Sequence, residues 1–344
     1  MTKVLISGAS VAGPALAYFL AAAGYDVTVV ERARELRDNG YNIDFRGDAF
    51  AVLADLGIED RIRGLDTRMR GTTVLDETGA KVGELPREVF SSDVEVPKRE
   101  LTRLLHEITA DRVRYVFGDS ITSIEDGHVE FECMPAADYD LVIGADGVYS
   151  NVRRLVFGAD GLVHLGLSGA GFSLPNHLGL EHRGLLWRDS GAMVYLCSAN
   201  DPERLTVGMS FTTDSPELDR RPRAEQEAAV RAAFAGYGWE IPRLLDAMAT
   251  ADDFRFDSTC QVRVDSWSRG RVALVGDAGY CAAPTSGMGT SQALIGARTL
   301  ARLLASCDDH AIAFAAYERE LRPYVAENQE IGRAHAQSLT ATPA

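Results

Sequence analysis

The first thirty-one residues constrain the fold of this chain most strongly. Residues 3–7 are a short apolar run rich in β-forming residues, residues 8–13 read Gly-Ala-Ser-Val-Ala-Gly, and a helical stretch then extends to Ala23. Gly24 is expected to end this helix, and residues 26–31 form a second β-rich run. Both runs are apolar enough to be buried on both faces, as in parallel sheets. The segment therefore predicts a βαβ unit in an α/β protein.

The turn of this unit has the features of a nucleotide cradle. Gly8 permits the tight turn and Gly13 permits close packing of the helix on the strand. Ser10 occupies the second glycine position of the usual G-x-G-x-x-G pattern, and its hydroxyl can donate to a phosphate. Together with Val11 and Ala12, the turn presents the N–H groups of a helix N-terminus to a pyrophosphate.

An acidic residue stands where such a cradle needs one. Glu31 lies 18 residues after Gly13 and is followed by Arg32, so its carboxylate can accept hydrogen bonds from ribose hydroxyls. The same carboxylate disfavours the 2′-phosphate of NADP. This unit thus predicts an ADP-containing cofactor, FAD or NAD, and does not separate the two. The alternative is an ordinary βαβ turn without a ligand.

The rest of the chain alternates between helical and β-rich segments. Two regions, 70–96 and 162–215, read as β-rich, and a buried strand is predicted at residues 140–144 and again at 271–275. Helices are predicted over residues 46–65, 99–108, 223–250 (one or two helices), 290–305 and 311–339, the last of these interrupted at Pro323.

Composition excludes several classes of protein. Thirty-five Lys and Arg against 50 Asp and Glu give a net charge of −15, which argues against a general nucleic-acid binder. No apolar run approaches the roughly 20 residues of a membrane span, and no signal peptide is recognisable. Five cysteines without a CxxC pair argue against a disulfide framework or a zinc cluster. We expect a cytoplasmic protein without a metal.

Two further motifs separate FAD from NAD. Residues 146–153 read Asp-Gly-Val-Tyr-Ser-Asn-Val-Arg, and Gly276-Asp277-Ala278 is followed by Pro284-x-x-Gly287-x-Gly289. These segments match the D-G-x-x-S-x-x-R and G-D segments of flavoprotein aromatic hydroxylases. The chain resembles the class A, single-component FAD monooxygenases, the family of para-hydroxybenzoate hydroxylase and the tetracycline-inactivating hydroxylases. Three motifs in the family order extend the resemblance over nearly the whole chain.

The resemblance implies roles for residues of these motifs. Asp277 would bind the ribityl chain of FAD, because the strand at 271–275 delivers it to the carboxyl edge of a parallel sheet. The alternative for Gly276-Asp277 is a simple helix N-cap. The backbone of Gly287, Met288 and Gly289, in the loop opened by Pro284, would contact the flavin ring.

Acidic and basic residues near the FAD phosphates complete the implied cofactor site. Asp146 would lie near the pyrophosphate. Arg46 and Arg99 resemble family arginines that approach the FAD phosphates or the adenosine, and each could instead be a solvated charge at a helix end. Arg153 could pair with Asp146 as a purely structural clamp.

The resemblance also implies the architecture. It predicts a Rossmann-like FAD-binding domain of the para-hydroxybenzoate hydroxylase type over residues 1–67, 92–159 and 258–308. An inserted β-rich substrate domain would comprise residues 68–91 and 160–257, and a C-terminal helical segment residues 309–344.

The reaction implied is the hydroxylation of an aromatic or polycyclic small molecule. NADPH or NADH would reduce FAD as a transient co-substrate, in agreement with the absence of a second dinucleotide cradle from the sequence. O₂ would then add at the flavin C4a atom, and the hydroperoxide would transfer a hydroxyl group to the substrate. The protein would act as a monomer or a homodimer.

Side chains of the β-rich part are candidates for lining the substrate cavity. We expect some of these residues to face the cavity and others the second side of the sheet, with the register open: Phe172, His177, Trp187, Tyr195, Met209 and Phe211. His177 is the only plausible base among them, although a surface or core histidine is the commoner case. Cys281 in the flavin loop could attach flavin covalently, but a small buried thiol is the simpler interpretation.

Other flavoprotein activities are alternatives. A flavin-dependent reductase of isoprenoid double bonds and a non-catalytic escort-type binding protein share the fold. A flavin-dependent halogenase is disfavoured, because the segment Trp239-Glu240-Ile241-Pro242 has Tyr237 where the halogenase signature has a tryptophan.

Overall fold

The computed structural model describes residues 1–36, 41–89, 92, 94–158, 161–199 and 201–340. Contacts between Cα atoms divide the chain into two compact units, which alternate along the sequence. Unit 1 comprises Met1–Leu65, Val96–Val163 and Cys260–Gly332, and unit 2 comprises Asp66–Glu95, His164–Thr259 and Arg333–Ala344. The predicted domain boundaries at residues 91–92 and 159–160 involve residues outside the described ones, as does the end of the predicted C-terminal segment at 341–344. The assignment of the two parts to cofactor and substrate stays a prediction.

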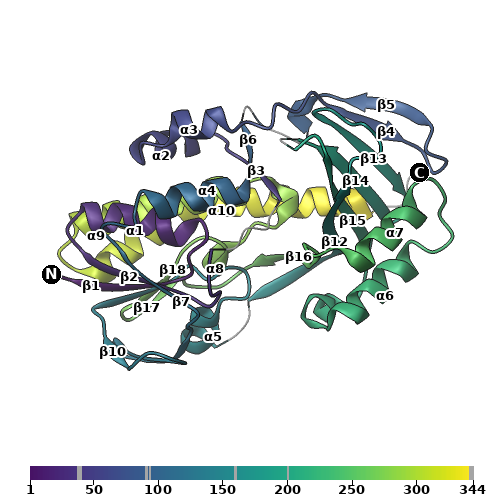
Figure 1. Cartoon of the computed structure of the whole chain (residues 1–344). Coiled ribbons are helices and arrows are strands. Elements are labelled where there is room, and N and C mark those ends of the chain that lie inside the picture. The colour runs from purple at the N-terminus through teal and green to yellow at the C-terminus, as the bar shows by residue number, and fades with distance from the viewer. Residues whose placement is uncertain (37–40, 90–91, 93, 159–160, 200, 341–344) are drawn as a thin grey trace. The chain divides into compact units, whose positions relative to one another are not determined.

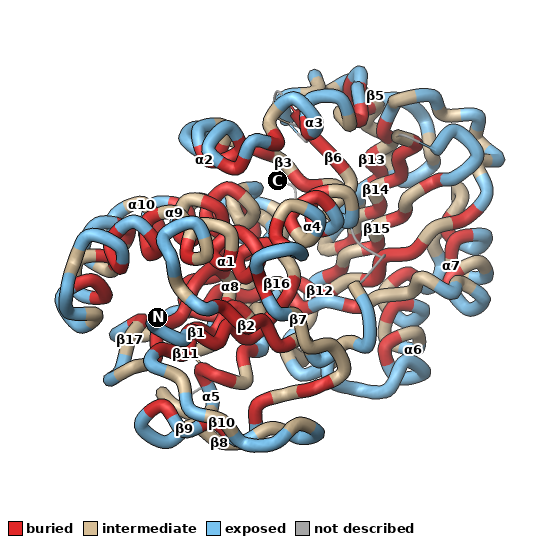
Figure 2. Tube along the Cα trace, turned by 60° about the vertical axis from the view of Figure 1, so that its left-hand side comes forward, coloured by how far each residue is buried: buried red, intermediate tan, exposed pale blue. Residues whose placement is uncertain are grey.

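Unit 1 is built on a six-stranded sheet with the order β17-β18-β11-β1-β2-β7. Its central strands are parallel and buried, as Figure 2 shows, and only the edge strand β17 runs antiparallel. The strands are β1 (Lys3–Ser7), β2 (Asp26–Glu31), β7 (Arg114–Phe117), β11 (Leu141–Gly144), β17 (Ser268–Arg269) and β18 (Val272–Leu274). This order confirms a Rossmann-like α/β sheet, in which ligands bind at the carboxyl ends of the strands.

Helices α1 and α9 lie side by side in this unit (Figure 1). The helical elements of the unit are α1 (Ala12–Ala22), α2 (Ala49–Asp55), α3 (Glu59–Gly64), α4 (Lys98–Glu107), α5 (Asn151–Phe157), α8 (Asp277–Tyr280), η3 (Pro284–Ser286), α9 (Gly289–Ser306) and most of α10 (His310–Thr340). Two small sheets complete the strands, namely β8 (Ile121–Glu125), β9 (His128–Phe131) and β10 (Ala137–Asp138), and the pair β3 (Asn42–Asp44) and β6 (Glu95–Pro97).

Two helix predictions require correction. The helix predicted over residues 46–65 is two helices, α2 and α3, because Gly57 adopts a left-handed conformation with φ +70° between them. The predicted interruption at Pro323 is wrong, since α10 continues through it. Proline removes one backbone hydrogen bond from a helix, and the buried side chains of Tyr317, Leu321 and Val325 on either side keep this helix packed.

Unit 2 is built on a seven-stranded sheet with the order β16-β12-β15-β14-β13-β4-β5. Its strands are β4 (Thr72–Leu75), β5 (Lys81–Leu85), β12 (Leu162–Pro175), β13 (Arg183–Asp189), β14 (Ala192–Ser198), β15 (Arg204–Thr212) and β16 (Arg255–Val262). Helices α6 (Arg223–Ala233) and α7 (Ile241–Thr250) cover one face, as Figure 1 shows, and two 3-10 turns, η1 (Arg87–Val89) and η2 (Pro216–Arg220), lie in the connections.

The core of unit 2 lies between this sheet and the two helices. Alternate residues of β12, β14 and β15 pack there against Val230 of α6, Phe234 at the end of α6 and Leu244 of α7. Side chains on the intervening positions therefore point to the opposite face of the sheet. This register decides which candidate substrate residues can reach a ligand.

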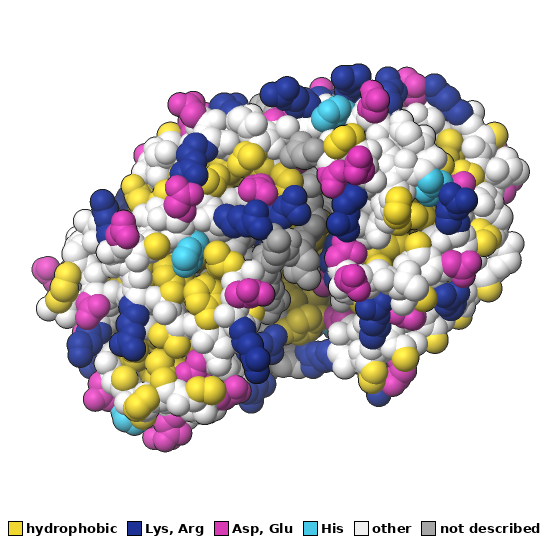
Figure 3. All heavy atoms as spheres, viewed as in Figure 1, with side chains coloured by type: hydrophobic (Ala, Val, Ile, Leu, Met, Phe, Trp, Pro, Cys, Tyr) yellow, Lys and Arg dark blue, Asp and Glu magenta, His cyan; other side chains and the backbone are white. Residues whose placement is uncertain are grey.

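The surface carries acidic and basic side chains close to one another on the face shown in Figure 3. Among the described residues, no helix combines the length and the apolar character that crossing a bilayer requires.

Candidate functional site

The turn between β1 and α1 has no room for side chains at its glycines. Gly8 has φ +111°, and a Cβ atom on it would lie 2.4 Å from the carbonyl oxygen of Ala145. A Cβ atom on Gly13 would lie 1.9 Å from the oxygen of Gly8. The start of α1 has no acidic residue in its first turn and no side-chain cap, so its N–H groups can accept an anion, and Ser10 stands beside them partly exposed. Val11 and Ala12 are buried in the turn.

Glu31 connects the end of β2 to this turn. Its Oε2 atom accepts a hydrogen bond from the N–H of Ala9 at 2.9 Å, and its Oε1 atom accepts one from the N–H of Ala33 at 2.9 Å. A carboxylate oxygen has more than one acceptor position, so a carboxylate can also accept from a ribose hydroxyl. The carboxylate is therefore fixed beside the cradle, while the neighbouring Arg32 is exposed.

The second motif lies at the carboxyl end of β11, directly beside β1. Asp146 accepts hydrogen bonds from the hydroxyl of Ser150 and from the N–H groups of Asn151 and Val152, the latter two at 2.8 and 3.1 Å. It thus caps α5. Burial raises the pKa of Asp146, and these hydrogen bonds offset part of that effect.

Arg153 is a buried clamp between two of the motifs. Its Nη2 atom donates to the carbonyl oxygen of Val148 at 2.7 Å and its Nη1 atom to that of Ala278 at 2.8 Å. The guanidinium therefore joins the D-G-x-x-S segment to the G-D segment. The sequence left open whether Arg153 is a structural clamp. In the structure it joins the two segments through these two carbonyl groups.

We expect Arg153→Met to destabilise the protein by about 3 kcal/mol or more, because a buried and a partly buried carbonyl group lose their charged donor. Urea unfolding followed by circular dichroism measures the change. Arg154→Met is the matched control, since Arg154 is the next residue of the same helix, is exposed, and its guanidinium donates to the side chain of Asn151. Its cost should stay below about 0.5 kcal/mol. Equal losses in both variants would contradict the clamp.

The third motif packs on the start of α1. A Cβ atom on Gly276, which has φ +65°, would lie 3.0 Å from the Cβ of Ala12. Asp277 follows at the first position of α8. Burial raises the pKa of its carboxyl group, and the positive charge of Lys98 partly opposes this effect. Lys98 was not singled out in the sequence, although it stands next to Arg99 at the start of a predicted helix.

The raised pKa of Asp277 has a consequence for the protein without FAD. Above this pKa the folded state holds a charged carboxylate that is better solvated in the unfolded chain, whereas below the ordinary aspartate pKa both states are neutral. We therefore expect Asp277→Asn to stabilise the FAD-free protein at neutral pH, with the gain falling as the pH is lowered towards about 4. Urea midpoints at both pH values measure this, and the exposed Asp111→Asn is the control. A gain that persists at low pH would contradict the charge explanation.

The loop from Pro284 to Gly289 turns sharply before α9. Gly287 has φ +64°, and the N–H of Met288 donates to the hydroxyl of Ser286 at 3.1 Å. Gly289 has nothing within 4 Å of an added Cβ atom, and α9 begins there without an acidic residue in its first turn. The loop thus exposes backbone to a flat ligand.

Arg46 lies against this loop. Its Nη2 atom would be 3.7 Å from a Cβ on Gly287, and its own N–H donates to the hydroxyl of Ser291 at 2.9 Å. The Nη2 atom pairs with Asp44 at 3.0 Å, whereas the buried Nε atom has no hydrogen-bond partner among the described residues. A buried cationic donor without a partner is what a phosphate or a flavin oxygen would satisfy.

Two other candidates are placed differently. Arg99 is half exposed and bonds to the adjacent Glu100, so the structure brings it to none of the motifs. The thiol of Cys281 is buried and donates to the carbonyl oxygen of Cys260 at 3.6 Å, and burial raises its pKa well above the ordinary value. A thiol that resists deprotonation is a poor nucleophile for covalent attachment of flavin.

These features together fit FAD. The turn at Gly8 and Gly13 admits a pyrophosphate where side chains would collide, Asp277 is a carboxylate at the edge of the sheet, and the Arg46 Nε atom is an orphaned donor. The turn and Asp277 lie at the carboxyl ends of β1 and β18, and Arg46 lies against the loop that leads into α9. The residues of unit 1 can therefore hold this cofactor.

The structure places most of the substrate candidates in the core of unit 2. Phe172, Trp187, Met209 and Phe211 are almost fully buried on the face that α6 and α7 cover. Tyr195 lies on the opposite face, because its neighbours Val194 and Leu196 belong to the core.

His177 lies in the turn after β12 with both ring nitrogens engaged. The Nε2 atom is 2.7 Å from the carboxylate of Glu240, and the Nδ1 atom is 3.2 Å from the carbonyl oxygen of Pro175. These contacts tie the turn to the start of α7. Of the six candidates, four thus lie in the core of unit 2, His177 lies in a turn, and Tyr195 lies on the opposite face of the sheet.

Known proteins resemble the chain over almost its whole length. The family model described as FAD binding domain matches residues 1–337. A flavin-dependent monooxygenase from an unknown prokaryotic organism is 38% identical over 96% of this chain and 88% of its own length. The flavin-dependent monooxygenase of Legionella longbeachae is 36% identical over 96% of this chain and 87% of its own length.

A solved structure agrees with these relatives. The crystal structure of tetracycline destructase Tet(55) superimposes with a TM-score of 0.91 at 38% identity, covering 98% of this chain and 90% of the other. The comparisons therefore agree with the fold and with the flavin-dependent monooxygenase family indicated by the three motifs. They give no support to the reductase and escort-type alternatives. The chain belongs to the FAD-binding-domain family and, within it, to the FAD-dependent monooxygenases, the class A flavoprotein oxidoreductases.

Proposed function

We propose that the protein hydroxylates an aromatic or polycyclic small molecule, with NADPH or NADH as the reductant and O₂ as the oxidant. The observation that carries this proposal is the convergence of three motifs at one sheet edge in unit 1, through the contacts of Gly8 with Ala145, Gly276 with Ala12 and Arg153 with Ala278. The similarity to a tetracycline destructase makes tetracyclines the first polycyclic compounds to test.

Each motif has a proposed task in holding the cofactor. The start of α1 and Ser10 would bind the pyrophosphate, Glu31 the ribose, and Asp277 the ribityl chain. Arg46 would donate from its Nε atom to a phosphate or a ring oxygen. The Pro284–Gly289 loop would lie under the flavin ring, where the start of α9 favours negative charge.

The division of labour follows from this site. Bound FAD supplies the two-electron and oxygen chemistry, which no side chain can supply. The chain would fix the position of the ring through backbone contacts at Gly287 and Met288. NAD(P)H would bind transiently, because the described residues contain one dinucleotide cradle and FAD would occupy it.

The experiment that tests the proposal starts from the absorption spectrum of the purified protein. Flavin bands should be present, and NADPH oxidation in air should accelerate when tetracycline or a reactive phenol is added. Mass spectrometry of the product formed under ¹⁸O₂ should show one labelled oxygen atom. A reduced product formed without O₂ would favour the reductase alternative, and a protein that cannot be reconstituted with FAD would overturn the proposal.

A further inference from the structure

The Pro284–Gly289 loop of unit 1 is preceded by a residue whose backbone conformation is rare for any residue with a side chain. Ala283 has φ +75° and ψ 151°, and it is buried. This conformation is accessible mainly to glycine, and another residue keeps it only where the surrounding structure constrains it. The contacts of the residues beside Ala283 must therefore supply that constraint.

A pair of buried amide side chains fixes the carbonyl group of Tyr280, three residues before Ala283. The Nε2 atom of Gln292 in α9 donates to the carbonyl oxygen of Tyr280 at 2.7 Å. The Nδ2 atom of Asn328 in α10 donates to the Oε1 atom of Gln292 at 2.9 Å, which fixes the orientation of the glutamine amide. Gln292 and Asn328 are both buried. Because a buried amide is costly unless it is hydrogen-bonded, the contact with Tyr280 is part of what makes this arrangement stable.

Two further glutamines bind the next two carbonyl groups of the segment. The Nε2 atom of Gln329 in α10 donates to the carbonyl oxygen of Cys281 at 3.3 Å. The Nε2 atom of Gln261 in β16, a fully buried side chain, donates to that of Ala282 at 3.2 Å. The carbonyl groups of residues 280–282 thus each accept a hydrogen bond from a glutamine side chain, and the three glutamines come from three different elements.

Helix α10 approaches the same segment closely at a glycine. A Cβ atom on Gly332 would lie 2.1 Å from the carbonyl oxygen of Ala282, so a larger residue at this position would push the helix away. The hydroxyl of Thr285, inside the loop, donates to the carbonyl oxygen of Gly332 at 2.7 Å. All of these residues belong to unit 1. Helix α10 is therefore in contact with the chain on both sides of Ala283.

We propose that these three glutamines, Gln261, Gln292 and Gln329, are positioning residues for FAD. They constrain residues 280–283 so that the Pro284–Gly289 loop keeps the shape that it presents to the cofactor. The inference rests on the proposed place of that loop under the flavin ring, and it names the side chains that prepare the loop for binding. A loop that already has its bound conformation loses less conformational entropy when the ligand binds. Without the glutamines, the strained backbone would relax before FAD binds.

Gln292→Met tests the proposal with a side chain of similar size that has no amide. The carbonyl group of Tyr280 loses its glutamine donor and Asn328 loses its acceptor. We therefore expect the amide hydrogens of residues 281–289 to exchange faster in the FAD-free protein, as measured by hydrogen–deuterium exchange and mass spectrometry. FAD should bind about tenfold more weakly in a fluorescence titration of the same protein.

Gln226→Met is the matched control in unit 2. Gln226 is a buried residue of α6, and its Nε2 atom donates to the carbonyl oxygens of Leu218 and Asp219 at 3.1 Å each. This variant also loses a buried amide with hydrogen bonds to backbone, so its thermal unfolding midpoint should fall as well. Exchange over residues 281–289 and the affinity for FAD should remain those of the wild type. The control thus separates a loosened loop from a general loss of stability.

Ala283→Gly tests the strain against which the glutamines are proposed to act. Glycine adopts φ +75° without strain, so this single change should raise the thermal unfolding midpoint. Combined with Gln292→Met, it should restore the affinity for FAD to within about threefold of the wild type, because the backbone no longer relaxes away from the loop conformation. A merely structural defect at position 292 would not be repaired by a change at position 283.

Three results would overturn the proposal: unchanged exchange or FAD affinity in Gln292→Met, an equal loss of affinity in Gln226→Met, or no rescue by Ala283→Gly. If Gln292→Met does not fold, Thr285→Val decides, since it keeps the shape of the side chain and removes the hydroxyl group that bonds to Gly332. Exchange of the loop at the wild-type rate in that variant would also contradict the proposal. The proposed function is judged separately, by flavin content and by substrate-dependent NADPH oxidation of the wild type. A wild type that is yellow and hydroxylates a substrate, beside an unchanged Gln292→Met variant, would retain the function and lose this inference.

Discussion

Replacing Asp277 by alanine is expected to yield a folded protein that purifies without FAD. The carboxylate is partly buried at the carboxyl edge of the sheet, and its hydrogen bonds to ribityl hydroxyls would be charge-assisted. Such bonds contribute about 1.5–3 kcal/mol each, so losing two weakens binding by roughly two to four orders of magnitude. The ratio of flavin to protein absorbance after dialysis measures the loss.

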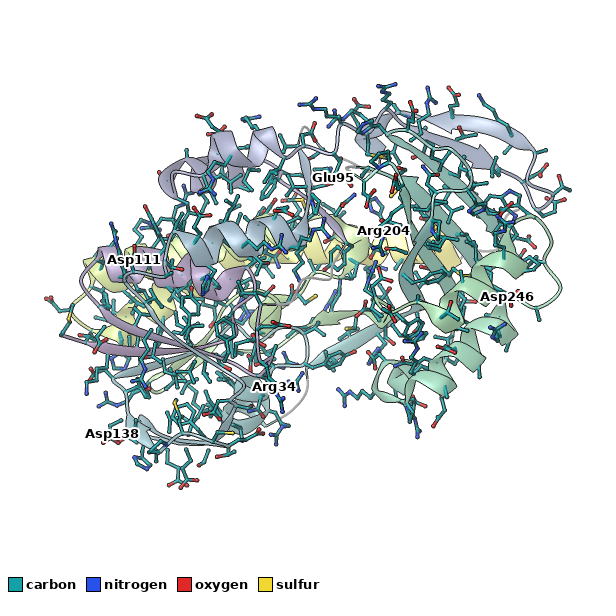
Figure 4. The ribbon with its side chains drawn as sticks, viewed as in Figure 1. Arg34, Glu95, Asp111, Asp138, Arg204 and Asp246 are labelled. Atoms are coloured by element: carbon teal, nitrogen blue, oxygen red, sulfur yellow. The ribbon has the colours of Figure 1, made fainter. Side chains whose placement is uncertain are left out.

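Two further variants test whether the loss of FAD is due to the Asp277 carboxylate itself. Asp277→Asn keeps one acceptor oxygen without the charge, so we expect FAD to remain bound with intermediate affinity. Asp111→Ala, at an exposed position of unit 1 labelled in Figure 4, should keep full flavin occupancy. Full occupancy in Asp277→Ala would show that this carboxylate does not hold the ribityl chain.

Gly8→Ala is expected to have the second large effect. A side chain at φ +111° is strained, and its Cβ atom would lie 2.4 Å from the oxygen of Ala145 and 3.0 Å from the Cα of Asp146. Both contacts are with backbone at the end of β11, which cannot rotate away. We expect a loss of more than about 3 kcal/mol in the free energy of unfolding, together with loss of FAD.

Gly24→Ala separates the strain from the collision. Gly24 follows α1 and also has a positive φ, of +88°, but its added Cβ meets nothing within 4 Å in the described part of the chain. This variant should lose about 1 kcal/mol and should keep FAD. If both variants lost the same stability, the close approach of β1 and β11 would not be what requires glycine at position 8.

Local signals predicted the FAD-binding part well. Strand, glycine turn, helix and acidic residue follow one another within the first thirty-one residues, and adjacent residues determine each of these features. The strand before Asp277 and the glycines of the Pro284–Gly289 loop are equally local. The sequence order of the motifs did not reveal that Arg153 joins two of them, because that contact links residues 125 positions apart.

The substrate-binding part could not be assigned in the same way. Successive side chains of β12, β14 and β15 lie on alternate faces of the sheet. The sequence pattern alone does not say which of the two faces is the core. Large residues such as Phe172 and Trp187 lie in the core because α6 and α7 cover that face. The glycines of these strands could have indicated which positions lie outside the core. Gly171, Gly184 and Gly208 all occupy positions on the face opposite α6 and α7.

By itself, the sequence determined the α/β class, the nucleotide turn and the family, because these depend on short segments and on motifs in a fixed order. Only the tertiary structure decided which face of the unit 2 sheet forms the core of that unit, since this depends on helices that follow later in the chain. It also decided that α10 continues through Pro323, because packing on both sides outweighs one missing hydrogen bond. The features of each motif depend on adjacent residues, whereas the hydrogen bond from Arg153 to Ala278 forms only where two distant segments meet.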